Sequence, residues 1–237
     1  MFSDVLQQQV MKQMGFGSLY DVADVVTYKP EKSWNYEVGA HLSTPSHKVQ
    51  ADLALFYIDC RDQQLTVFPE GQVTGRLMTN AGRTRSFGGE ASLLATLWRN
   101  LDLQVAYGYT RATFVKFDTG KADYAGNFIP YAPQHTLYAG ASYTLRTGWN
   151  WLEYVIFRVA ANGAGRIYWN EANTFSQPFY ALLEASIRFE HRHWAVDVWG
   201  RNLTDTRYDT FYFMSIGNSF LQRGRPRTFG VSLSITL

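Results

Sequence analysis

The sequence predicts an all-β protein: an antiparallel up-and-down meander of about nine or ten strands that is an incomplete portion of a transmembrane β-barrel. Nine stretches of the chain alternate between apolar side chains and polar or small ones, which is the period of a β-strand. Their connections are short and long in turn. Because no run reaches the roughly 18 apolar residues that a transmembrane helix needs, only strands could span a membrane.

The alternation is clearest in the last stretch. Its odd-numbered positions from Phe229 to Ile235 are large and apolar, whereas its even-numbered positions from Thr228 to Thr236 are Thr, Gly or Ser. The stretches 34–43 and 136–145 alternate in the same way. The apolar series from Leu101 to Tyr109 is long enough for a tilted barrel strand, which crosses a bilayer with about 9–11 residues.

The stretch from Phe179 to Glu190 indicates which face meets lipid. Phe179 and Phe189 stand at the two ends of an aliphatic series, with charged residues on the opposite side. This resembles an aromatic girdle around a lipid-facing band, with a wet lumen behind it. We therefore expect five apolar residues to point to lipid and three charged residues to point to the interior: Ala181, Leu183, Ile187, Leu233 and Ile235, and Glu90, Glu184 and Arg188, respectively.

The connections predict the orientation of the sheet. The short ones, at 44–47, 98–100, 146–150 and 190–193, should all lie on one side, and the long ones, at 61–80, 117–134, 162–178 and 204–226, on the other. Outer-membrane barrels have short periplasmic turns and long extracellular loops. This orientation places Leu237 in the periplasm.

Residues 1–32 are expected to form an extracellular loop-like segment, and residues 33–237 to supply barrel strands. Hydrophobic residues between Val5 and Met14 have loosely helical spacing, so the segment could include a short helix. The sequence begins without the pattern of a signal peptide. Since single-chain bacterial barrels have even strand numbers, nine strands imply at least one earlier strand. We therefore expect the sequence to be a piece of a longer precursor.

Composition and residue spacing limit the classes of partner and cofactor that we expect. The formal net charge is +2 and the basic residues are scattered, so nucleic-acid binding is not expected. The single Cys60 cannot form an internal disulfide. His191 and His193 lie in a predicted turn without a third ligand, so neither a metal site nor another cofactor is expected.

Four motifs resemble those of TonB-dependent outer-membrane receptors. They read YKPEKSWNYEVG at 28–39, NAGRTRSFGGE at 80–90, NLTDTRY at 202–208 and GRPRTFGV at 224–231. In that family the first two mark late barrel strands, the third follows the penultimate strand and the fourth opens the last one. The motifs occur here in the same order and cover about residues 28–237.

The resemblance implies that the chain supplies roughly the last nine strands of a 22-strand barrel, about the size of other outer-membrane transporters. It also implies energised uptake of a scarce nutrient, such as a ferric siderophore, through the bacterial outer membrane. The implied partners are outer-membrane lipid, the barrel-assembly machinery and the siderophore or another bulky nutrient. A TonB-type energy transducer would act only through a plug domain that this sequence lacks.

Aromatic and cationic residues in the long connections are the candidate ligand contacts. Aromatic rings give a large contact area with little rotamer entropy, and Arg suits anionic siderophore groups. The candidates are Tyr124, Tyr131, Trp169, Tyr212 and Arg223. The alternative interpretation is a belt of aromatic residues at the membrane interface, as flanks every such barrel.

Other function classes stay open at this point. A small passive porin or a soluble all-β binding domain would also show alternating strands. An outer-membrane barrel hydrolase would need a nucleophile with an orienting His and carboxylate. His135 is the only His near the expected outer rim, and its position fits the start of a strand better than catalysis. The chain is therefore not expected to be an enzyme.

Overall fold

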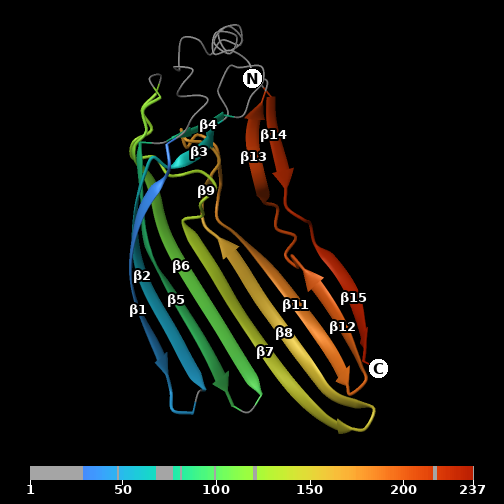
Figure 1. Cartoon of the computed structure of the whole chain (residues 1–237). Coiled ribbons are helices and arrows are strands. Elements are labelled where there is room, and N and C mark those ends of the chain that lie inside the picture. The colour runs from blue at the N-terminus through green and yellow to red at the C-terminus, as the bar shows by residue number, and fades with distance from the viewer. Residues whose placement is uncertain are drawn as a thin grey trace, which may run out of the picture.

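Nine antiparallel strands form one curved sheet in the computed structural model, which describes residues 29–46, 48–67, 77–80, 82–98, 100–119, 122–215 and 218–236 (Figure 1). In spatial order the strands are β1 (Lys32–Ser43), β2 (Val49–Arg61), β5 (Arg83–Leu97), β6 (Leu101–Lys116), β7 (His135–Trp149), β8 (Leu152–Ala164), β11 (Tyr180–His191), β12 (Trp194–Arg201) and β15 (Thr228–Ile235). Each strand pairs with the next in this order, which confirms the predicted meander.

The short helix expected near the start of the chain lies outside the described residues. Within the described ranges, no helix is long and apolar enough to cross a bilayer. The connection expected at 146–150 is shorter than predicted, because β7 continues to Trp149 past an irregularity in its pairing with β8. The Trp149 amide donates to Thr147 Oγ1 at 3.1 Å there.

The two ends of the sheet differ as the connection lengths predict. At the end that we call the turn end, short connections join β1 to β2, β5 to β6, β7 to β8 and β11 to β12 (Figure 1). At the opposite end, which we call the loop end, three of the four long connections contain two-stranded ribbons. These ribbons are β3 (Gln64–Val67) with β4 (Leu77–Asn80), β9 (Ile167–Tyr168) with β10 (Ser176–Gln177), and β13 (Asp209–Ser215) with β14 (Asn218–Arg223).

The two faces of the sheet also follow the predicted alternation. Leu233 and Ile235 are 64% and 66% exposed on the outward face, where no other part of the described chain covers them. Glu184 and Ser186 alternate with the outward Leu183 and Ile187 and line a hollow on the concave face. The sheet is therefore a curved wall with an apolar outer face and a polar inner face.

The motif at 202–208 forms the corner through which the chain leaves β12. Asn202 is 5% exposed, and its side-chain amide donates to the carbonyls of Thr206 and Arg225, at 3.0 Å in both cases. Its Oδ1 accepts the Thr206 amide at 2.9 Å. Asp205 accepts the Arg227 amide at 3.0 Å. Asn202 and Asp205 have φ angles of 49° and 52°, a region that Asn and Asp tolerate better than most residues. These motif residues thus join β12 to β15.

Packing at the same corner explains why a glycine stands at position 224. Tyr208 stacks on Tyr180 with ring centroids 4.5 Å apart. The Gly224 backbone lies against the Tyr208 ring, so a Cβ atom at Gly224 would come within 2.1 Å of Tyr208 Cζ. Glycine is required there because the ring occupies the space of a side chain.

Candidate functional site

The long connection between β6 and β7 is fixed to the one between β8 and β11 by asparagine side chains. Asn173 Oδ1 accepts the Phe128 amide at 2.6 Å, and Asn173 Nδ2 donates to the Phe128 carbonyl at 2.9 Å. Asn127 Nδ2 donates to the Glu171 carbonyl at 2.8 Å. Asn173 has a φ of 56°, so a turn conformation that asparagine tolerates places its amide against Phe128. The two connections therefore form one unit.

The connection between β12 and β15 joins the same unit at two points. The Tyr131 hydroxyl donates to the Tyr212 carbonyl at 3.0 Å. The Asp209 amide donates to Gln177 Oε1 at 2.8 Å, and Gln177 is 6% exposed. Burial and the nearby charge of Glu171 raise the pKa of the Tyr131 phenol, so this donor stays protonated in neutral solution.

Seven aromatic residues from these three connections pack together, and we call them the loop aromatic cluster: Phe128, Tyr131, Tyr168, Trp169, Phe175, Phe211 and Tyr212. Tyr131 stacks on Phe211 with centroids 5.5 Å apart and tilts against Trp169 at the same distance. Phe175 stacks on Tyr212 at 4.8 Å, and Phe128 on Tyr168 at 5.4 Å. These ring contacts form three groups from segments distant in sequence. Hydrogen bonds join the groups, because the Tyr131 amide donates to the Tyr168 carbonyl at 2.8 Å and the Tyr131 hydroxyl to the Tyr212 carbonyl at 3.0 Å.

Burial divides the cluster into a base and a surface. Trp169 and Tyr212 are 7% and 8% exposed, so their rings support the others. Tyr131, Phe175 and Phe211 are 41%, 41% and 37% exposed, so their rings are open to a ligand.

The structure brings together three of the five candidate residues, Tyr131, Trp169 and Tyr212. Tyr124 lies apart, because its ring packs on Phe117 at 5.5 Å in a small core within its own connection. Arg223 is exposed at the end of β14, opposite Asp209. Sequence reasoning missed Phe175 and the two amide side chains, Asn173 and Gln177. The asparagines at 170 and 173 were the available signal, since this residue type favours turns.

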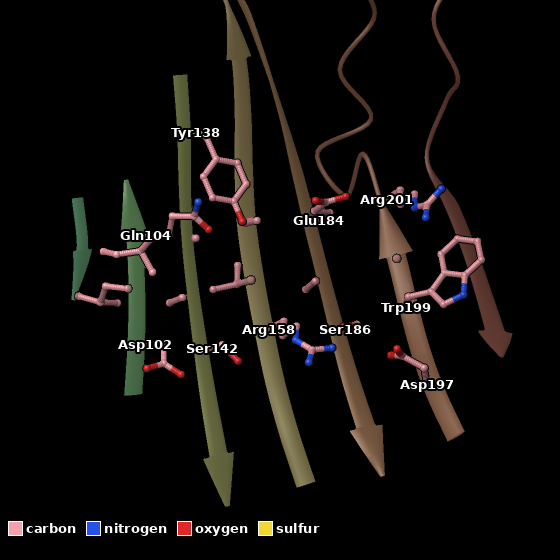
Figure 2. A pocket seen from close by; sticks show the side chains of 18 of the residues that line it. Asp102, Gln104, Tyr138, Ser142, Arg158, Glu184, Ser186, Asp197, Trp199 and Arg201 are labelled. Atoms are coloured by element: carbon pink, nitrogen blue, oxygen red, sulfur yellow. The ribbon is translucent and has the colours of Figure 1, made fainter. Parts of the chain in front are cut away.

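A second candidate region is the concave face, where a hollow of about 530 Å³ lies over β6 to β15 (Figure 2). Asp102, Gln104, Tyr138, Arg158, Glu184 and Arg201 are among the polar side chains that line it. Arg188 Nε binds Glu190 Oε2 at 2.8 Å, and Arg188 Nη1 lies 3.9 Å from Asp197 Oδ2. Asp197 Oδ1 is buried without a hydrogen-bond partner in the described part of the chain. This polar lining is typical of the interior of a wide barrel.

Comparison with known proteins supports the architecture. Residues 12–203 match the sequence model of a family described as TonB dependent receptor-like, beta-barrel. The pesticin receptor of Yersinia pestis is 28% identical over 218 residues, which cover 90% of this chain and 30% of the relative. The pesticin receptor of Yersinia enterocolitica matches to the same extent. The chain thus spans 30% of the length of these relatives.

Solved structures match in the same way. The ferric yersiniabactin uptake receptor from Yersinia pestis superposes with a TM-score of 0.72 and 25% identity, over 86% of this chain and 30% of that protein. A siderophore receptor from Acinetobacter baumannii has a TM-score of 0.69 at 18% identity, over 89% of this chain and 29% of that protein, which indicates a shared fold alone.

Proposed function

Because this chain belongs to the β-barrel family of TonB-dependent receptors of the outer membrane, we propose that it forms part of the wall and outer loops of a receptor for energised uptake of a ferric siderophore. The observation that carries the proposal is the match to the ferric yersiniabactin uptake receptor over 86% of the chain. The pesticin receptors are matched over 90% of it.

In this proposal the loop aromatic cluster contacts the ligand outside the membrane. Tyr131 offers an exposed ring, and Phe175 and Phe211 extend the same surface. Trp169 and Tyr212 support these rings from beneath. Arg223 supplies a positive charge for an anionic siderophore group, although it lies outside the cluster. Tyr124 would act indirectly, by holding the β6–β7 connection in shape.

We further propose that the chain is a receptor and not an enzyme. The family assignment supports this role. The polar concave face would then line the inside of the barrel, where it faces water or a plug domain.

Deletion of the gene that encodes this chain from its host tests the proposal. Cells would be given a panel of ⁵⁵Fe-loaded siderophores, with and without a protonophore. We expect one siderophore to lose energy-dependent uptake on deletion and to recover it on complementation. Unchanged uptake of every siderophore in the panel, in a strain whose parent makes the protein in its outer membrane, would reject the proposed function.

Two matched variants test the ligand surface. Phe211→Ala removes a ring of the loop aromatic cluster, and Phe157→Ala removes a ring of similar exposure from the outward face of β8. We expect Phe211→Ala to weaken ligand binding to cells by about fivefold or more, as loss of a central aromatic contact does. Phe157→Ala should leave binding unchanged. Equal effects of the two variants would count against ligand contact by the cluster.

A further inference from the structure

Six basic residues gather on the outward face of β1, β2, β5 and β6 next to the loop end. Strand register arranges the outward residues in rows across these four strands. The row nearest the loop end consists of Lys32, Arg61, Arg83 and Lys116. The next row contains Arg85, and the third contains Arg111. We call these six residues the basic rim.

Within the described part of the chain, the basic rim has more cations than there are carboxylates in and beside its rows. Asp59 is the one carboxylate within these rows, and it binds Arg83 Nε and Nη2 at 2.7 and 2.8 Å. Arg61 and Arg85 act on the same carboxylate at longer range. Three more described carboxylates, Glu31, Asp62 and Asp118, lie at the border, and Glu31 accepts the Gln64 amide at 3.1 Å. Among the described residues, six cations thus face four carboxylates, and every member of the rim except Arg83 is exposed.

The rows below the basic rim change character step by step. The third row holds Tyr36, Tyr57 and Phe87 beside Arg111, and the rows after it contain aliphatic residues such as Val38, Leu53 and Leu55. The basic, aromatic and aliphatic rows follow the order of the layers in a lipid leaflet. Basic residues suit the headgroups, aromatic residues the interface and aliphatic residues the hydrocarbon.

In the other half of the described wall, Arg227, directly before β15, is a single cation in alternation with the outward residues of that strand. Near the loop end of β11 and β15, the outward residues include Phe179 and Phe229, which are 59% and 70% exposed. The positive charge is therefore concentrated on one half of the outer face.

We propose that the basic rim binds the phosphate groups of lipid headgroups in the leaflet at the loop end. The guanidinium groups suit phosphate because their planar donors can bind two of its oxygens at once. The aromatic and aliphatic rows below would contact the acyl chains of the same lipid. The inference rests on the membrane placement in the proposed function, but it does not depend on which nutrient is taken up.

The test uses the full chain extracted from outer membranes in mild detergent and freed of lipid. The probes are lipid A carrying two phosphates and the same lipid A with its phosphates removed, and binding is measured by native mass spectrometry. We expect the phosphorylated probe to bind more tightly and to be displaced by salt, which screens exposed charges. Arg61→Gln with Arg85→Gln should weaken its binding by about tenfold or more, because each basic residue near an anionic surface contributes separately.

The matched control is Lys48→Gln with Arg192→Gln, which removes the same charge from exposed residues at the turn end. This control should bind like the unchanged chain, as should Arg61→Lys with Arg85→Lys, which keeps the charge. Equal binding of the two lipid probes to the unchanged chain would overturn the proposal, as would equal losses in the rim and turn-end variants. Siderophore uptake should survive the rim substitutions, so failure of the lipid site and failure of the proposed function are distinguishable.

Discussion

The wall and the loop end of this protein are stabilised by different interactions. Backbone pairing runs without interruption from β1 to β15, and its register shifts only between Arg83 and Thr84 and between Arg146 and Trp149 within the described sheet. At the loop end, backbone pairing is confined to short ribbons and a few single bonds, and side chains add the contacts between connections. Tyr131 reaches the Tyr212 carbonyl across 81 positions of sequence, and Asn173 reaches Phe128 across 45.

This difference shows that the wall and the loop end place different requirements on the sequence. The wall has an apolar outer face and a polar concave face, which requires only that residues alternate along each strand. The loop end needs particular residues at particular places, because its surface is assembled from three connections. The wall should therefore tolerate changes that keep the polarity of a position, whereas the loop end should be sensitive to the loss of single groups.

The largest expected effect comes from reversing polarity on the outer face of the wall. Val105 points outward and is 43% exposed, whereas its neighbour Gln104 lines the concave hollow. Val105→Arg should lower the free energy of unfolding by about 2–4 kcal/mol if the position lies near the membrane midplane. The measurement is urea unfolding of the protein in lipid vesicles.

Gln104→Arg is the control for this reversal of polarity. It adds the same side chain to the wet face and should change stability by less than about 1 kcal/mol. Equal costs for the two substitutions would contradict the assignment of faces.

A smaller effect is expected at the corner between β12 and β15. Asn202→Ala would leave the Arg225 and Thr206 carbonyls and the Thr206 amide without their partner in a buried site. Leaving such groups unsatisfied should cost about 1–3 kcal/mol in the same unfolding experiment. Asn35→Ala, at an exposed position of β1, should stay within about 0.5 kcal/mol of the unchanged chain. A neutral Asn202→Ala would show that the corner does not depend on this amide.

The smallest effect is expected at the loop end itself. Tyr131→Phe keeps the ring and removes the hydroxyl that donates to Tyr212. The loss of one hydrogen bond of about 0.5–1.5 kcal/mol should speed amide hydrogen exchange in β13 and leave exchange in β7 and β8 unchanged. Tyr36→Phe, on the outer face of β1, serves as the control. If β13 exchanged at the same rate in all three proteins, the three connections would not behave as one unit.

The wall could be predicted from the sequence because its signal is local and repeated. Alternation from Thr228 to Ile235 or from Leu101 to Tyr109 identifies both the strand and its two faces. The short connections then give the strand order. The sequence also showed that the long connections are rich in aromatic residues, but it did not show which of these residues contact each other.

What the sequence could not supply was the contact between distant segments. Tyr124 and Tyr131 look alike in sequence, yet Tyr124 packs on Phe117 within its own connection and Tyr131 packs on Trp169 and Phe211 from two others. No local pattern distinguishes these outcomes, because they depend on how three connections meet in space. The role of the motif at 202–208 was hidden for the same reason, since Asn202 bonds to Arg225 across 23 positions.

The central claim, that this chain is an outer-membrane wall with its loop end outside the cell, is tested most directly by labelling single cysteines. Ala125→Cys at the loop end and His193→Cys at the turn end are both exposed positions. Each would be introduced separately together with Cys60→Ala, and intact cells would be treated with a membrane-impermeant maleimide. We predict that Cys at position 125 is labelled in intact cells and that Cys at position 193 is labelled only after the outer membrane is permeabilised. Labelling of position 193 but not of position 125 in intact cells, or equal labelling of both, would contradict this placement.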